Sequence, residues 1–249
     1  MELSVFRANP AGNITLFVQS FVMQEKRAEA ATRLMERFDA EQVAFVVPGG
    51  DADGAIEMMG GEFCGNATRA YGAYLAEKVG KKEHSLRVSG CETPVAVEVE
   101  GSYAAAQMPL PRAVRAYPQG MLVDLGGIVH FVTEAAPSEE FFAAIETEIL
   151  QKTGAEAYGV IFLDREKGAI APLVKVVSTD TLVWESSCGS GTLAAAAAES
   201  FGTAEGTFER AYLQRAGTIL AWLKYREGII EQASIGGKVS FDAPITVEI

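Results

Sequence analysis

Two cysteines, Cys64 and Cys188, open short stretches of nearly matching sequence, and their chemistry and position suit them to proton transfer. The first stretch reads Cys-Gly-Asn-Ala-Thr, and the second, 124 residues later, reads Cys-Gly-Ser-Gly-Thr. The residues after each stretch have helical character, which predicts a helix that begins just after each cysteine. A thiol at a helix N-terminus meets unpaired backbone N–H groups and the positive end of the helix dipole. Both effects lower a thiol pKa, so we expect both cysteines to favour the thiolate.

The same helix starts offer a carboxylate site beside each thiol. Gly65 and Gly189 let a ligand approach the backbone closely, and N–H groups at a helix N-terminus bind anions. Two such sites facing one amino acid would hold its α-carboxylate, remove the α-proton with one thiolate and protonate the opposite face from the other thiol. The pattern therefore predicts an amino-acid racemase or epimerase that needs no cofactor, with Cys64 and Cys188 as its catalytic residues.

A cysteine can also be only a small buried hydrophobic residue, and a single motif of this kind would favour that interpretation. The same motif at two helix starts favours chemistry instead. The third cysteine, Cys91, lies between predicted strands without a glycine-to-helix context, and we assign it no role.

A second repeat indicates that the chain is built from two related halves. Residues 12–18 and 126–132 match at four of seven positions, and they precede the two cysteine motifs in the same order at a similar offset. Two ordered repeats at similar offsets are typical of a duplicated domain.

We place the domain boundary in the stretch 109–118, where Met-Pro-Leu-Pro precedes a turn-rich segment. The predicted N-terminal domain is residues 1–114, and the predicted C-terminal domain is residues 115–241. The last strand, within residues 242–249, is expected to return to the first domain.

Periodicity and turn signals predict a similar set of elements in each half. We expect helices over residues 25–38, over 67–79 with a stop at Gly80, over 190–201, and from an N-cap at Ser138. The predicted strands have in common an apolar or alternating pattern and cover residues 12–18, 43–47, 95–99, 126–132, 158–163, 173–177, 218–223, 239–241 and 245–249.

Composition excludes several classes of protein. The 249 residues include 21 Lys and Arg against 33 Asp and Glu, a net charge of −12, so nucleic acid is not an expected partner. No apolar run reaches about 18 residues, which argues against a membrane span. The N-terminus lacks a basic segment followed by an apolar one, so we expect a cytoplasmic protein. The three cysteines form no C-x-x-C pair, and we expect no metal site.

The residues around the two cysteines also resemble a known superfamily. Phe-Cys-Gly-Asn-Ala-Thr-Arg at 63–69 and Glu-Ser-Ser-Cys-Gly-Ser-Gly-Thr at 185–192 are similar to motifs of the diaminopimelate epimerase and proline racemase superfamily, as are Asn-Pro-Ala-Gly-Asn at 9–13 and Gln-Arg-Ala-Gly at 214–217. The resemblance implies an α/β (α+β) fold of two pseudo-symmetric domains. Each would be a curved, mostly antiparallel sheet around a central helix, with the active site between the domains and a homodimeric assembly.

Within the superfamily, the chain departs from diaminopimelate epimerases and is more similar to the histidine racemases of staphylopine-type metallophore pathways. Position 67 is Ala where diaminopimelate epimerases have Gly, and Thr-Leu-Val-Trp-Glu-Ser-Ser occupies 181–187 in place of their Glu-Arg-Gly segment. The motifs shared with histidine racemases include Glu-Gln-Val at 41, Glu-Phe-Cys at 62, Val-Ser-Gly-Cys at 88, Gln-Met-Pro at 107 and Trp-Glu at 184.

The resemblance assigns roles to further residues. It makes Glu41 the candidate partner of a substrate imidazole, although a solvated loop residue is the simpler interpretation of that position. Asn13 and Asn66 fit amide partners of the substrate, and Glu185 fits its ammonium group. Ser190 completes the second carboxylate site beside Gly189. His130 is expected to be a packed, hydrogen-bonded residue without a catalytic role.

Three other functions remain open at this point. One is a diaminopimelate epimerase of an unusual subtype, which keeps the two-thiol chemistry. Another is a thiol redox protein in which the two cysteines form a reversible disulfide. The last is a binding domain without turnover.

Overall fold

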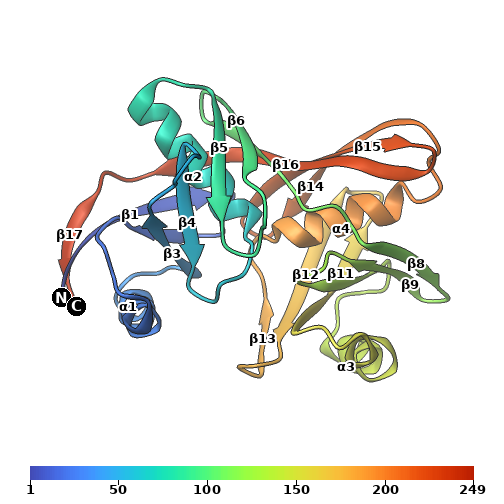
Figure 1. The fold of residues 1–249 in the computed structure, drawn as a ribbon. Helices are drawn as coiled ribbons and strands as arrows, with labels where there is room; N and C mark the ends of the chain where they lie inside the picture. The colour runs from blue at the N-terminus through green and yellow to red at the C-terminus, as the bar shows by residue number, and fades with distance from the viewer. The chain divides into compact units, whose positions relative to one another are not determined.

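The computed structural model describes all 249 residues, which form two compact units (Figure 1). Unit 1 comprises Met1–Gln107 and Gly236–Ile249, and unit 2 comprises Met108–Ile235. The two domain boundaries predicted from the sequence, after residues 114 and 241, lie a few residues later than these unit boundaries. The chain leaves unit 1 at the end of strand β7 (Tyr103–Gln107) and re-enters it in the middle of the long strand β16 (Ile229–Phe241), where the sequence has no break.

Unit 1 is a mixed, mostly antiparallel sheet with two helices. Its helices are α1 (Gln24–Arg37) and α2 (Gly65–Val79). Besides the end of β16, its strands are β1 (Glu2–Pro10), β2 (Thr15–Val18), β3 (Gln42–Val47), β4 (Gly54–Met58), β5 (Glu83–Val88), β6 (Val95–Glu100), β7 (Tyr103–Gln107) and β17 (Ile245–Glu248). The parallel pairs β2–β3 and β4–β5 are joined through α1 and α2, as crossovers between parallel strands require.

The last strand returns to unit 1, as the sequence predicted. Strand β17 pairs antiparallel with β1, with Glu2 opposite Glu248 and Val5 opposite Ile245. The two ends of the chain therefore lie together, as Figure 1 shows. Val247 is buried in the same hydrophobic cluster as Leu3, so the terminal strand completes the core that lies under α1.

Helix α2 is the central helix of unit 1. Its residues from Gly65 to Tyr74 are all buried, and it packs against β1, β5, β6 and β7. Gly72 allows the close approach to β6, because a Cβ at this position would lie 2.4 Å from Cγ1 of Val97. The helix ends where the sequence predicts, with Gly80 in the left-handed conformation at φ 71°.

Unit 2 has the same kind of construction. Helices α3 (Glu139–Ile145) and α4 (Gly189–Glu199) accompany a short π turn (Glu146–Leu150) and a 3-10 turn (Gln151–Thr153). Its strands, besides the start of β16, are β8 (Ala113–Tyr117), β9 (Gly120–Asp124), β10 (Val129–Thr133), β11 (Ala157–Asp164), β12 (Ala169–Val176), β13 (Thr181–Trp184), β14 (Gly206–Gln214) and β15 (Gly217–Arg226). Strands β10 and β11, joined through α3, pair in parallel, and a single parallel bridge links β12 and β14.

Helix α4 is the central helix of unit 2, and its alanine run explains how closely it packs. Leu193 and the alanines from Ala194 to Ala197 are all buried, and the helix contacts the strands β9, β10, β11 and β15. Small side chains let the helix approach the sheet on several sides at once, which is typical of a helix that is apolar all round.

The four predicted helices are confirmed with shifts of one or two residues at their predicted ends. Ser138 caps α3, accepting a hydrogen bond from the Phe141 N–H at 3.2 Å. The turn-rich segment expected over 109–118 is wrong in part, because residues 113–117 form strand β8, which pairs with β9 across a tight turn at Pro118. No helix of the structure is long and apolar enough to cross a membrane.

Candidate active site

Cys64 is the N-cap residue of α2, and its sulfur occupies the place where a serine or aspartate oxygen commonly lies. The Ala67 N–H points at Sγ from 3.4 Å, and the backbone of Asn66 also bonds the sulfur. The side chain of Gln42 donates to the same sulfur at 3.3 Å from strand β3. Three donors thus converge on one sulfur, which suits a thiolate.

Gln42 gathers the predicted substrate residues of unit 1 around this cysteine. Its amide nitrogen lies 2.7 Å from Oδ1 of Asn13 and 2.8 Å from Oγ1 of Thr15, in addition to the sulfur of Cys64. Asn13 in turn donates from Nδ2 to the Glu41 carboxylate at 2.7 Å. The structure therefore places Asn13, Glu41 and Cys64 in one hydrogen-bonded group. Gln42 is not among the site residues predicted from the sequence, although it belongs to the Glu-Gln-Val motif at 41–43.

Cys188 is the N-cap residue of α4 in the same way. Its sulfur accepts the Gly191 N–H at 3.2 Å and lies 3.4 Å from the Ser190 hydroxyl. The backbone N–H of Cys188 donates to the Gln214 side chain at 2.7 Å, which fixes the start of the helix. The Glu185 carboxylate accepts a hydrogen bond from the Cys188 thiol. The structure thus brings Glu185, Ser190 and Cys188 together within unit 2.

Gln214 also holds the start of helix α4 beside Cys188, and it is not among the site residues predicted from the sequence. Its Nε2 donates to Oγ1 of Thr192 at 2.8 Å, and that hydroxyl donates to the Cys188 carbonyl oxygen at 2.7 Å. The feature of the sequence that could have predicted a role for Gln214 is its position as the first residue of the Gln-Arg-Ala-Gly turn.

His130 is fully buried behind the second cysteine, packed and hydrogen-bonded as predicted. Its Nε2 lies 2.9 Å from the Ser190 hydroxyl, so one serine separates the imidazole from the sulfur of Cys188. Burial lowers the pKa of His130 to about 3, and the ring is therefore neutral at physiological pH.

The expectation that both cysteines favour the thiolate is wrong for the protein without substrate. Burial raises the pKa of Cys64, and the helix N–H groups and Gln42 offset only part of that effect. Burial raises the pKa of Cys188 well above its ordinary value, and the nearby Glu185 carboxylate adds to the rise. Desolvation of a small anion outweighs a few hydrogen bonds at these positions. A thiol of raised pKa gives a more basic thiolate, so a thiolate formed at Cys64 or Cys188 is a stronger base toward an α-proton.

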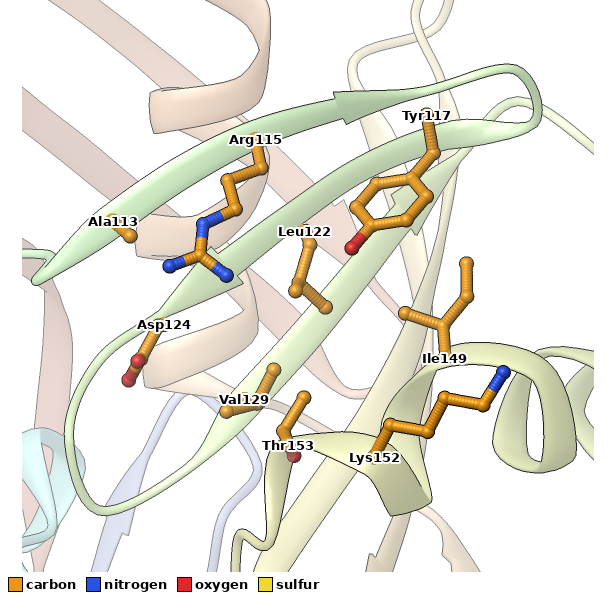
Figure 2. Close-up of a pocket in the computed structure, with 9 residues that line it drawn as sticks. All are labelled: Ala113, Arg115, Tyr117, Leu122, Asp124, Val129, Ile149, Lys152 and Thr153. Atoms are coloured by element: carbon orange, nitrogen blue, oxygen red, sulfur yellow. The ribbon is translucent and has the colours of Figure 1, made fainter.

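Unit 2 also contains an open groove of about 300 Å³ (Figure 2), and Cys188 is not among the residues that line it. Figure 2 shows Arg115 and Tyr117 on the β8 strand and Lys152 on the helical segment across from them. Val129 lines the groove, whereas the next residue, His130, bonds Ser190 at the start of α4. Successive side chains of a strand point to opposite faces, so the groove and the cysteine lie on different faces of the sheet.

The fold is shared with known solved structures. A solved structure described as a predicted epimerase from Pseudomonas aeruginosa matches with a TM-score of 0.69 at 16% identity, covering 98% of this chain and 99% of that chain. Two units, each a mostly antiparallel sheet around a central helix, form the diaminopimelate epimerase-like fold.

Sequence comparison identifies one family among the proteins that share this fold. The family model described as the histidine racemase CntK N-terminal domain matches residues 2–246. A histidine racemase of Fusobacterium nucleatum is 31% identical over 214 residues, covering 77% of this chain and 78% of that protein. A histidine racemase of Staphylococcus aureus is 28% identical, covering 93% of this chain and 92% of that protein. The chain belongs to the histidine racemase family, and it is an amino-acid racemase.

Proposed function

We propose that this racemase interconverts L- and D-histidine, with Cys64 and Cys188 as the two acid–base groups. The observation that supports the pair most strongly is that each cysteine caps the buried central helix of its own unit with its sulfur facing backbone N–H groups. The third thiol, that of Cys91, has no such cap. The mechanism requires the two sulfur atoms to reach opposite faces of one substrate Cα.

The reaction needs one thiolate and one thiol. The thiolate removes the α-proton and becomes a thiol, and the opposite thiol gives its proton to the other face of the carbanion and becomes the thiolate. The product is the mirror-image amino acid, and the enzyme is left with its proton on the other sulfur. The number of protons on the pair is unchanged, so no external acid or base is consumed.

The carbanion is the costly species, and backbone donors are the groups that lower its energy. We assign the substrate carboxylate to the helix starts at Gly65, Asn66, Gly189 and Ser190. Preorganised donors of this kind contribute roughly 3–4 kcal/mol each to a transition state in which charge develops. General acid–base catalysis by the two thiols adds a factor of about 10²–10⁴.

Glu41 is the proposed partner of the substrate imidazole. Its carboxylate is oriented by the Asn13 amide at 2.7 Å, within the hydrogen-bonded group that contains Cys64. A carboxylate accepts an imidazole N–H and stabilises the protonated ring. The Glu185 carboxylate, at the other cysteine, is the proposed partner of the substrate ammonium group.

The substitution Glu41→Gln tests this assignment. It keeps the shape and the contact with Asn13 but removes the charge. We expect kcat/KM for histidine to fall about 10-fold or more, since a hydrogen bond to a charged group contributes roughly 1.5–3 kcal/mol. Steady-state kinetics with chiral chromatography measures the effect, and Glu36→Gln, an exposed change on α1, is the matched control. Unchanged kinetics in Glu41→Gln would remove Glu41 from the substrate site.

We further propose a homodimer in the cytoplasm that supplies D-histidine to the synthesis of an opine-type metallophore. The support is membership in the histidine racemase family and the motifs shared with racemases of such pathways. The expected partner is a small amino acid rather than a nucleic acid, in keeping with the net charge of −12. Light scattering on the purified protein tests the dimer.

Exchange of the α-proton in D₂O tests the substrate. L-histidine and LL-diaminopimelate are incubated separately with reduced enzyme without added cofactor. Loss of the histidine α-proton signal together with formation of D-histidine is the expected result. Exchange only with diaminopimelate would keep the two-thiol chemistry and make the protein an epimerase of that substrate. Exchange with neither would contradict the proposed function.

A further inference from the structure

A line of contacts within unit 2 leads from the imidazole of His130, on β10, through the hydroxyl of Ser190 to the sulfur of Cys188. Nε2 of His130 lies 2.9 Å from Oγ of Ser190, and that oxygen lies 3.4 Å from the sulfur. His130 is fully buried, and its other ring nitrogen, Nδ1, is buried without a hydrogen-bond partner. The only polar contact of this buried ring is therefore the one that it makes with Ser190.

The surroundings of Nδ1 are backbone and apolar side chains. Strand β10 pairs with β11, which places His130 opposite Gly159. A Cβ added at Gly159 would lie 3.0 Å from Nδ1 and 3.0 Å from Cγ2 of Val174. The imidazole thus occupies the space that this glycine leaves open, and Nδ1 faces a part of the core that offers it no partner.

The contacts of the ring decide which nitrogen carries its proton. Burial lowers the pKa of His130 to about 3, so the ring is neutral at physiological pH and has one N–H and one acceptor nitrogen. A proton on Nδ1 would be a buried donor without an acceptor, whereas a proton on Nε2 meets the Ser190 oxygen. Buried N–H groups without a partner are rarer in proteins than acceptors without one. The proton therefore lies on Nε2, and His130 donates to Ser190.

A hydroxyl oxygen that accepts this hydrogen bond still has its own proton to donate. We propose that His130 is a positioning residue for racemisation, whose Nε2–H holds the Ser190 hydroxyl as a fixed donor to the sulfur of Cys188. The inference rests on the proposed two-thiol function. A hydrogen bond to the sulfur stabilises the thiolate that forms at Cys188 during turnover, and a donor that is already oriented needs no reorganisation at that moment.

The two units supply a side-chain donor to sulfur in different ways. At Cys64 the donor is the amide nitrogen of Gln42, which cannot accept a hydrogen bond. At Cys188 the donor is a serine hydroxyl, which can donate or accept, so a further group must set its direction. The Glu185 carboxylate accepts the proton of the Cys188 thiol, and Ser190 donates to the thiolate. Cys188 thus has a partner for each protonation state, as alternating acid and base roles require.

Nuclear magnetic resonance of the parent protein, labelled with ¹⁵N in histidine, tests the position of the ring proton. The chain has two histidines, and the spectrum of either His84→Gln or His130→Gln assigns the two rings. Correlations between the carbon-bound ring protons and the ring nitrogens show which nitrogen is protonated. We expect His130 to be neutral with its proton on Nε2. A proton on Nδ1, or a charged ring at neutral pH, would overturn the proposal.

Alkylation of Cys188 by iodoacetamide tests the effect on the sulfur. The protein retains only this cysteine (Cys64→Ser, Cys91→Ser), and the rate is measured at one pH below the pKa of the thiol. We expect Ser190→Ala to lower the rate about 3-fold, because about 10-fold less thiolate is offset in part by the greater nucleophilicity of a more basic sulfur. His130→Leu should also lower the rate, since the Ser190 hydroxyl is then free to turn away.

Two further substitutions separate the hydrogen bond from packing. His130→Gln keeps an N–H donor near the position of Nε2 and should restore the rate that His130→Leu loses. His84→Leu removes the other buried histidine, which bonds the Lys81 carbonyl oxygen in unit 1, and should leave the rate unchanged. An unchanged rate in folded Ser190→Ala or His130→Leu, or no recovery in His130→Gln, contradicts the proposal. None of these measurements uses substrate, so a failure of the proposed racemisation would be seen separately in D₂O exchange.

Discussion

At the scale of single residues, each cysteine is at once desolvated and surrounded by donors. Burial raises the pKa of both thiols, while N–H groups at Ala67 and Gly191 act in the other direction. An amino-acid α-proton is a very weak acid, so a base of raised pKa is better matched to it than an exposed thiolate would be. The sequence predicts the positions of both cysteines but not this balance, because desolvation depends on the residues that pack around each sulfur.

His130 provides a prediction about pH and stability. Its pKa falls from 6.5 to about 3 on folding because the buried ring resists charging. The unfolded chain therefore binds more protons between these pH values, so the free energy of unfolding falls as the pH decreases through that range. The slope from this one group is about 1.4 kcal/mol per pH unit.

The substitution His130→Asn removes the titrating group and should remove that part of the acid slope. Urea denaturation at several values between pH 3 and 7 measures the difference between the two proteins. If both proteins lose stability in parallel as the pH falls, His130 is not held neutral by the fold.

At the scale of elements, the helices are predicted well because their signals are local. Periodic apolar residues mark α2, the left-handed Gly80 ends it, and Ser138 caps α3. Several strands carry no such local signal. The prolines that flank β8 resemble a linker and predict a turn, but the segment forms a strand because it pairs with β9. Gln42 and Gln214 escape prediction for a similar reason, since their partners lie 22 or more residues away in the sequence.

Gly72 provides a prediction about helix packing. In Gly72→Ala, the new Cβ would lie 2.4 Å from Cγ1 of Val97, so α2 or β6 must shift. We expect a loss of about 1–3 kcal/mol of stability, as for other over-packed cores. Adding Val97→Ala should recover part of the loss by making room. Gly127→Ala is the matched control, because a Cβ added at that position would meet no atom within 4 Å.

Denaturant midpoints of the parent protein and these three variants measure the differences. An unchanged midpoint in Gly72→Ala, or no recovery in the double variant, would mean that this close contact does not limit the packing of α2.

At the scale of the whole molecule, the sequence repeat corresponds to two units that share one design. Each unit has a crossover helix between parallel strands and a central helix capped by cysteine. The order of the strands is beyond prediction from local patterns, because it depends on pairings over the full length of the chain, such as β1 with β17. The family, in contrast, is predicted from the motifs around the two cysteines, and the match to the histidine racemase family model confirms it.

The most direct test of the two-thiol mechanism is deuterium exchange with the cysteine variants. Cys64→Ser, Cys188→Ser and the control Cys91→Ser are each incubated with L-histidine in D₂O, and D-histidine and α-proton loss are followed together. We expect racemisation to fall about 10²-fold or more in the first two proteins and to stay near normal in the third. Full racemisation by a folded Cys64→Ser or Cys188→Ser protein, or its loss in Cys91→Ser alone, would contradict the two-thiol mechanism.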